Sequence, residues 1–235
     1  MSIARLMQMA RAGVPAGPNP FGFVGFSANN VQTITASITI DYPSGTAEGD
    51  LCVVVVGVDN SNDYIATPSG WTEIYRVLGA NNSIQYNCFA KNVTSEDLSA
   101  GTLTISSSTT ANRGLSDGTG VVMSNFGDGS VITSAGTQVL GSNTIPNPAS
   151  LTLSAGDISL VVYYIDDQNN SSATLSDWTT ITNKFNSTSV DPGESGSGTA
   201  GAFYKEIISG GSYNPANIGS LQDRNATTHL ALRSN

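Results

Sequence analysis

Oxygen-bearing side chains gather at two corresponding places, each directly after a very apolar segment. The first group is DNSND, residues 59–63, and the second is DDQNN, residues 166–170. Carboxylate and amide oxygens at alternate positions are ligands that Ca²⁺ accepts, although this group lacks the glycine and the glutamate of an EF-hand. Asp and Asn also form ordinary loops by bonding their own backbone. The candidate glycan or cation residues are Asp59, Asn62, Asp63, Tyr64, Asp166 and Asn169.

Residue types that catalyse hydrolysis are scarce. A serine nucleophile needs a base, and the single histidine, His229, has no counterpart in the first half of the chain, so we interpret it as structural. Asp59 and Asp63 form a carboxylate pair that the second half does not keep, because Asn170 replaces Asp63 there. There is no glycine-rich phosphate loop before a helix and no His/Cys cluster with metal spacing. We therefore expect no catalytic residues, no metal site of this kind and no cofactor.

A long internal repeat determines where these groups lie. Residues 49–74 align without a gap to residues 156–181, an offset of 107, and 12 of these 26 positions are identical. The chain's two tryptophans, Trp71 and Trp178, occupy the same place in the two copies. NCFAKNV around Lys91 matches GAFYKEI around Lys205 at an offset of 114, which indicates a seven-residue insertion, most simply within 186–200. A period this long indicates a duplicated domain and not a solenoid.

Both copies have the patterns of β-strands, and helix signals are nearly absent after residue 12. Apolar residues alternate along residues 33–42, TITASITIDY, as in a strand with one buried face. The runs 51–59 and 158–166 are continuously apolar, which is typical of strands covered on both faces, by the other domain or by a partner subunit. Each tryptophan opens the strand that follows the polar loop. We expect its ring to cap a sandwich core, with a sugar-stacking platform as the alternative.

We therefore predict an all-β fold with two tandem homologous antiparallel β-sandwich domains of the jelly-roll or Ig-like kind. The domains cover residues 23–128 and 129–235. A short N-terminal helix or arm with a Pro/Gly spacer, residues 1–22, precedes them.

Composition excludes several classes of protein. Charged residues make up 11 % of the chain, the formal charge is −9 and the pI is about 4.3, so we expect no nucleic-acid partner. No run approaches the ~18 apolar residues that span a bilayer, so we expect no membrane insertion. Cys52 and Cys88 are too few for a disulfide framework or a four-cysteine zinc site, and we expect both to be small buried side chains.

The N-terminal segment has the pattern of an attachment peptide. Its apolar residues fall at i, i+3 and i+4 on one stripe of a short helix, with arginines off that stripe. A helix of about ten residues is marginal alone in water, so we expect a partner to order it; the alternative is a frayed terminus. The predicted particle-attachment residues are Ile3, Arg5, Leu6, Met7 and Arg11.

The repeated unit resembles a β-domain found in bacteriophage virion proteins and some bacterial surface proteins. The residues that carry this resemblance are GDL, PSGWT and FAK (49–51, 68–72 and 89–91) and, in the second copy, GDI, LSDWT and FYK (156–158, 175–179 and 203–205). The second copy has lost the Pro and Gly of the tryptophan turn. The segment SIARLMQMARAG, residues 2–13, also resembles leader segments of marine-phage structural proteins.

The resemblance implies an attachment peptide followed by exposed β-domains, and it supplies no catalytic residues. We therefore expect a non-enzymatic virion protein, either a capsid decoration (cement) protein or a tail or fibre component. Its partners would be other virion proteins of the capsid or tail, and it would be a homo-oligomer on the particle. The alternative is a carbohydrate-binding or adhesion module that recognises host surface glycans through the loops 59–64 and 166–172.

Overall fold

Antiparallel β-sheets form nearly all the regular structure of the computed structural model, which confirms the all-β prediction. The structure describes residues 17–30, 35–58, 65–78, 84–107, 115, 119–139, 147–166, 175–182, 198–216, 218 and 224–235. The elements are β1 (Gly25–Asn30), β2 (Ser37–Asp41), β3 (Leu51–Val58), β4 (Thr72–Leu78), β5 (Gln85–Asn92), α2 (Ser95–Ala100), β6 (Thr102–Ser106), β7 (Gly120–Asn125), β8 (Gly129–Val139), β9 (Leu151–Leu153), β10 (Ile158–Asp166), β11 (Thr179–Thr182), β12 (Gly198–Glu206), β13 (Gly211–Tyr213) and β14 (Arg224–Ser234).

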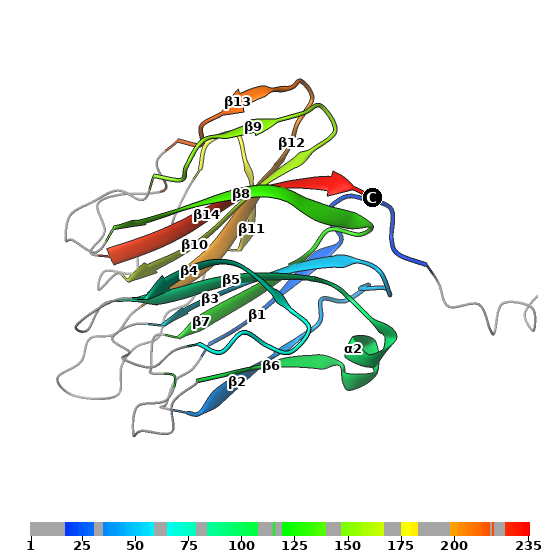
Figure 1. Cartoon of the computed structure of the whole chain (residues 1–235), viewed down its shortest axis with the longest axis vertical. Helices are drawn as coiled ribbons and strands as arrows, with labels where there is room; N and C mark the ends of the chain where they lie inside the picture. The colour runs from blue at the N-terminus through cyan, green and yellow to red at the C-terminus, as the bar shows by residue number, and fades with distance from the viewer. Residues whose placement is uncertain are drawn as a thin grey trace, which may run out of the picture.

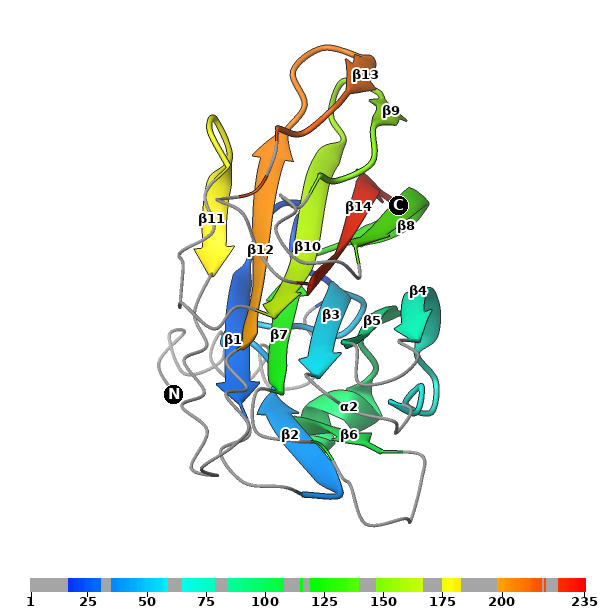
Figure 2. The same ribbon diagram turned by 90° about the vertical axis from the view of Figure 1, so that its left-hand side faces the viewer.

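Two five-stranded sheets dominate the molecule, and they have the same strand order. The first is β1-β7-β3-β5-β4, and the second, read from its β8 edge, is β8-β14-β10-β12-β11. Two-stranded sheets, β2-β6 and β9-β13, lie on the outer sides, so that the sheets form successive layers (Figure 1). Strands β3 and β10 run in the same direction (Figure 2).

The inner faces of the two large sheets share one hydrophobic core. In β3, Leu51, Val53 and Val55 point into this shared core, while the residues between them point to a second core under β2 and β6. From the other sheet, Leu160 and Val162 of β10 enter the shared core. Both faces of β3 and of β10 are therefore covered, which is why these segments are apolar at every position.

Residues of unequal size interlock across the shared core. Gly57 and Tyr164 are at equivalent positions of the repeat, and a Cβ on Gly57 would lie 1.9 Å from Tyr164 ring atoms. Tyr86, beside Gly57 in β5, crosses the core in the other direction and donates a hydrogen bond to Thr228 Oγ1 at 2.8 Å. Ala200 is the small neighbour of Tyr164 in β12. Each half therefore provides a small residue next to its large one, and the two tyrosines pack without collision.

The identical residues of the repeat form the same turns twice. Gly49 and Gly156 have φ angles of 92° and 88°, which favour glycine, and the aspartate after each accepts a hydrogen bond from a backbone N–H three residues earlier. The tryptophan turns also match, with φ of 77° at Gly70 and 63° at Asp177. Loss of the proline and the glycine in the second copy therefore left this turn unchanged, because aspartate tolerates the left-handed conformation.

A β-bulge after each tryptophan is the third shared feature. In β4 the extra residue between the pairs formed by Glu73 and Tyr75 is Ile74, and in β11 the extra residue is Ile181. Both isoleucines pack against the shared core. The repeated W-T-x-I pattern thus places an indole at the outer core and an isoleucine at the inner one.

Candidate functional site

The two tryptophans lie at the outer cores of their halves. Trp71 is 7 % exposed and packs with the residues of β2, β3 and β6. Trp178 is half-buried, packs beside Val161 and Phe203, and meets the ring of His229 edge-on, with centroids 6.0 Å apart. Trp71 thus has little free ring surface for stacking on a sugar.

His229 and Ser159 form a hydrogen-bonded pair inside the second half. The Ser159 Oγ lies 2.6 Å from His229 Nε2, and Nδ1 donates to the Ala149 carbonyl at 2.7 Å, since a carbonyl can only accept. Both side chains are fully buried, and burial lowers the pKa of His229. In the first half, Cys52 occupies the position equivalent to Ser159. Met123 occupies the position equivalent to His229, as the strand register shows. A nucleophile sealed in this way does not meet a substrate.

The two cysteines lie on opposite faces of one sheet. Cys52 packs in the outer core and Cys88 in the shared core, and both are fully buried. Burial raises the pKa of each thiol, so both are protonated at neutral pH. Within the described ranges, no group of three or more His, Cys, Asp or Glu side chains is placed to hold a metal ion.

A buried carboxylate anchors the start of the described chain. Residues 18–24, here called the strap, begin with Pro18 and Asn19, and Asn19 donates to both Asp50 oxygens, from its backbone N and from Nδ2, each at 2.7 Å. Asn125 Nδ2 and the Ala47 N–H add hydrogen bonds at 2.8 and 2.9 Å. Asp50 is fully buried and satisfied by neutral donors. Its counterpart Asp157 instead accepts two hydrogen bonds from Arg233 at 2.7 and 2.9 Å, which lower its pKa.

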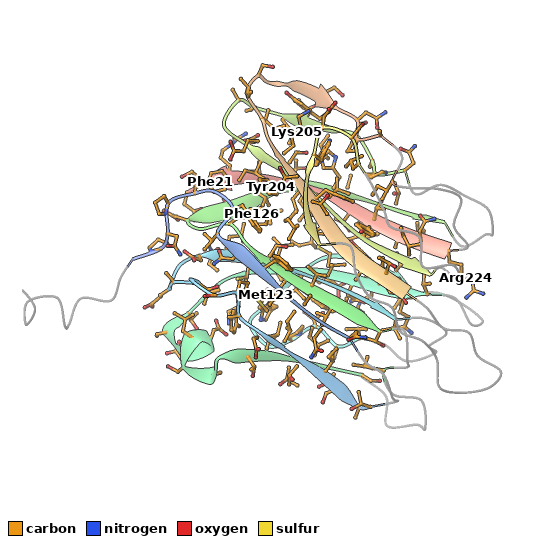
Figure 3. All side chains as sticks on the ribbon, turned by 180° about the vertical axis from the view of Figure 1, so that it is seen from behind. Phe21, Met123, Phe126, Tyr204, Lys205 and Arg224 are labelled. Atoms are coloured by element: carbon orange, nitrogen blue, oxygen red, sulfur yellow. The ribbon has the colours of Figure 1, made fainter. Side chains whose placement is uncertain are left out.

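The rest of the strap is fixed to both halves of the chain. Its Gly22 and Val24 N–H groups donate to the carbonyls of Phe126 and Asn125 at 3.1 and 2.9 Å. Phe23 stacks on Tyr204 of β12, with ring centroids 5.0 Å apart. Gly127 has φ of 64°, and a Cβ there would lie 2.2 Å from the Pro20 carbonyl oxygen. Figure 3 shows Phe21, Phe126 and Tyr204 at this end of the molecule, where the C-terminus also lies (Figure 1).

The candidate polar loops start at the opposite end of the two sheets. Strand β3 ends at Val58 and β10 at Asp166, whereas the strap packs where these strands begin. Val58 and Asp166, the last described residues before these loops, therefore lie at the same end, because β3 and β10 run in the same direction (Figure 2). Of the predicted residues, Asp166 pairs in register with Gly198 and Arg224. The other predicted residues lie outside the described ones: Asp59, Asn62, Asp63, Tyr64 and Asn169 in the loops, and Ile3, Arg5, Leu6, Met7 and Arg11 in the attachment segment.

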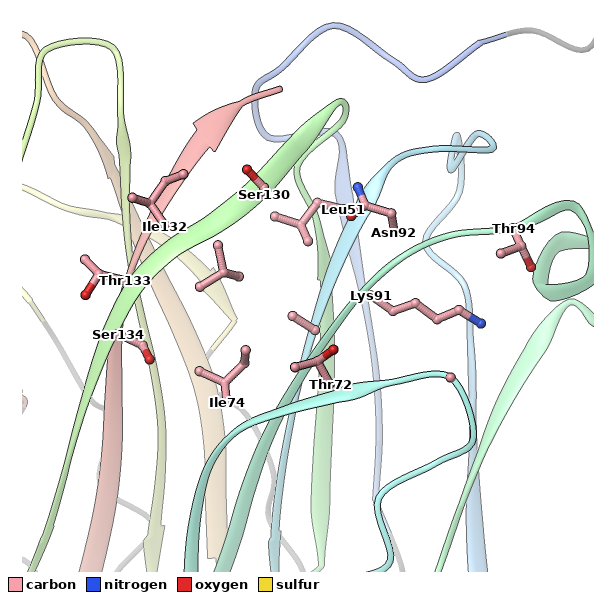
Figure 4. Close-up of a pocket in the computed structure, with 13 residues that line it drawn as sticks. Leu51, Thr72, Ile74, Lys91, Asn92, Thr94, Ser130, Ile132, Thr133 and Ser134 are labelled. Atoms are coloured by element: carbon pink, nitrogen blue, oxygen red, sulfur yellow. The ribbon is translucent and has the colours of Figure 1, made fainter.

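An open groove of about 780 Å³ lies between β8, an edge strand of its sheet, and strands β4 and β5 (Figure 4). Its apolar lining includes Leu51, Ile74, Ala90, Val131 and Ile132, and hydroxyl groups of Thr and Ser stand among them. Ile132 is an extra residue in β8, opposite the Ala231/Leu232 step of β14, and it is 47 % exposed.

Two side-chain contacts mark the limits of the groove. Lys91, paired with Asp97 at 2.6 Å, lies along one side. Beyond Ser134 the Tyr75 ring packs against Gly136, where a Cβ would lie 2.4 Å from ring atoms. No local sequence pattern indicates this groove, because its lining comes from both halves of the chain.

Comparisons with protein-family models, with curated proteins and with solved structures return no match for this chain. In the part of the chain that the structure describes, no helix is long and apolar enough to span a membrane.

Proposed function

We propose that this chain is a non-enzymatic structural protein of a bacteriophage particle, a capsid decoration protein or a tail or fibre component, attached through its N-terminal segment. The observation that carries the proposal is the strap. It ties the base of that segment to a buried carboxylate and stacks on the second half, so a load on the N-terminus reaches both halves. The resemblance of residues 2–13 to phage leader segments points the same way.

We further propose that each half descends from one ancestral β-sandwich domain. Equal strand order, equal Gly-Asp and tryptophan turns and equal bulges support a duplication. The contacts between the halves are also those of a two-fold pair. Strand β5 of the first half contacts β14 of the second through Tyr86 and Thr228, and their equivalents in the opposite halves, β12 and β7, contact each other as well. An isologous dimer joined into one chain would have this arrangement.

The chemistry of the described residues gives an enzyme little support. The one Ser–His pair is sealed in a core, and its third partner is a carbonyl where a triad has a carboxylate. A role that depends on shape and burial therefore agrees better with these residues.

Adhesion to a host glycan is the second candidate function. The observation in its favour is that the loops after β3 and β10 leave from the same end, opposite the strap. In a protein held at the strap, the ends of β3 and β10 would face outward. Binding of the full chain to a glycan array, lost in Tyr64→Ala, would support this function, and an array without any bound glycan would remove it.

Particle association tests the first proposal. Mass spectrometry and immunogold labelling of purified particles should find the chain on the head or tail. Added full-length protein should bind particles that lack it, Leu6→Asp should reduce that binding at least tenfold, and Gln8→Asp, off the apolar stripe, should change it less than twofold. Absence of the chain from particles, or equal binding by both variants, would contradict the proposal.

A further inference from the structure

The groove between β4 and β8 has the composition of a docking surface for an apolar side-chain stripe. Its lining is aliphatic and the polar groups are neutral hydroxyls and amides, apart from Lys91, which Asp97 already pairs. Ile132 leaves about half of its surface exposed there. In the described residues, aliphatic side chains this exposed are few, and Leu78 of β4 is another. An occupant that covers this lining would remove apolar surface from water.

The bulges select the kind of occupant. An added strand needs a regular edge, but both strands beside the groove carry an extra residue, Ile74 in β4 and Ile132 in β8. Bulges interrupt the ladder and are a common protection against strand addition. Both bulged residues, Ile74 and Ile132, are among those that line the groove (Figure 4). This favours a short amphipathic helix that inserts side chains.

One segment of the chain has the matching pattern. Ile3, Leu6 and Met7 fall on one stripe at helical spacing. Ten helical residues span about 15 Å. The five groove residues of β8, 130–134, span about 17 Å.

Charge favours the same occupant. Residues 1–16 contain Arg5 and Arg11 and no acidic residue. The remaining residues, 17–235, therefore hold 7 basic residues (9 − 2) and all 18 acidic ones, a net charge of −11. A basic segment is attracted to such a body.

The position of the strap indicates which copy of the chain provides the N-terminal segment for a given groove. It holds Pro18 beside Gly49, whose carbonyl accepts a hydrogen bond at 2.9 Å from Nδ2 of Asn92 at the end of the groove. Pro15, Pro18 and Pro20 favour an extended course for the chain before the strap. An extended connection favours the groove of a neighbouring copy over the chain's own groove.

We propose that the groove between β4 and β8 binds the N-terminal segment, residues 1–12, of a second copy of this chain. The inference rests on the proposed attachment role of this segment: copies joined through it would bind the particle cooperatively, so that loss of the apolar stripe would weaken particle binding as well. Reciprocal exchange between two copies would build a closed dimer, and head-to-tail exchange would build a ring or a continuous array on the particle.

Disulfide trapping between full-length chains tests the proposal. One chain carries Met7→Cys and the other carries Ile132→Cys. The native cysteines are fully buried and do not compete. The matched control replaces Ile132→Cys by Ile208→Cys, because Ile208 is 93 % exposed and lines a smaller pocket beside Phe21 of the strap. On mild oxidation we expect the 7–132 crosslink between chains to exceed the 7–208 crosslink at least tenfold.

Two results would overturn the proposal. One is equal yield of the two crosslinks. The other is a chain with both Met7→Cys and Ile132→Cys that closes only on itself, which would assign the groove to the chain's own segment. The particle-binding experiment is independent: crosslinking without particle association would refute the virion role alone, and particle association without crosslinking would refute the exchange alone.

Discussion

Replacing Gly57 by alanine would test how tightly the two halves of the chain depend on each other. The added Cβ would lie 1.9 Å from the Tyr164 ring and 2.6 Å from the Tyr164 Cβ. Backbone and ring must both shift, because neither atom is the end of a flexible side chain. Overpacking of this kind costs about 1–3 kcal/mol. Gly211→Ala is the control, since its Cβ meets no atom within 4 Å, and we expect a change within about 0.5 kcal/mol.

A double-mutant cycle separates the collision from other effects. Tyr164→Ala alone removes a fully buried ring and should cost about 3–5 kcal/mol. In that background the collision is gone, so Gly57→Ala should cost nothing or return a few tenths of a kcal/mol. The double variant should then be about 1–3 kcal/mol more stable than the sum of the single variants predicts.

Urea unfolding followed by tryptophan fluorescence provides the assay. Trp71 and Trp178 each report on one half, so Trp71→Phe and Trp178→Phe give a separate probe of each. Because the halves share a core, Gly57→Ala should shift both transitions to the same midpoint. The shared-core reasoning would be refuted if the losses of unfolding free energy in Gly57→Ala and Tyr164→Ala add within about 0.5 kcal/mol in the double variant. It would also be refuted if Gly57→Ala shifted only the transition that Trp71 reports.

Three further predictions concern the strap, the buried histidine and the thiols. Gly127 has a φ of 64°, and a Cβ there would lie 2.2 Å from the Pro20 carbonyl oxygen. Gly127→Ala should therefore lower the free energy of unfolding by about 2–4 kcal/mol, and limited proteolysis should cut residues 17–24 before it cuts the sheets. A strap that stays protected from the protease would contradict the role of this close approach. Since the folded pKa of His229 is lowered, its contribution to stability should be complete above about pH 6.5 and decline as pH falls, with a slope of up to about 1.4 kcal/mol per pH unit. The variant Ser159→Cys/His229→Met, which copies the first half, should lose this slope in denaturation curves between pH 7 and 5, and an unchanged slope would assign it to other groups. Cys52 and Cys88 should react with a thiol reagent only at the rate of global unfolding, and fast reaction of either in native protein would contradict their burial.

Features with a short sequence period could be predicted from the sequence. Alternation in TITASITIDY predicted a strand with one buried face, and β2, at its end, has Ile38 and Ile40 buried between more exposed neighbours. The continuous runs after Gly49 and Gly156 predicted strands covered on both faces, as β3 and β10 are. These patterns depend only on which face of a strand is buried from solvent.

Features that join distant residues could not be predicted in this way. Asn19 lies in a proline-rich stretch that looks like a free spacer, and its partner Asp50 is 31 residues away. The groove between β4 and β8 depends on how the two sheets pack, which no local pattern contains. The short helix α2 had a local signal, the capping box of Thr94 and Asp97, but it is only six residues long.

Electron cryomicroscopy of particles that carry this chain would test the proposed function most directly. Density for the two large sheets should meet the particle at the strap end, near Asn19 and Asp128, with the ends of β3 and β10 directed outward. Particles without such density, or with the body attached through the loop end, would contradict it.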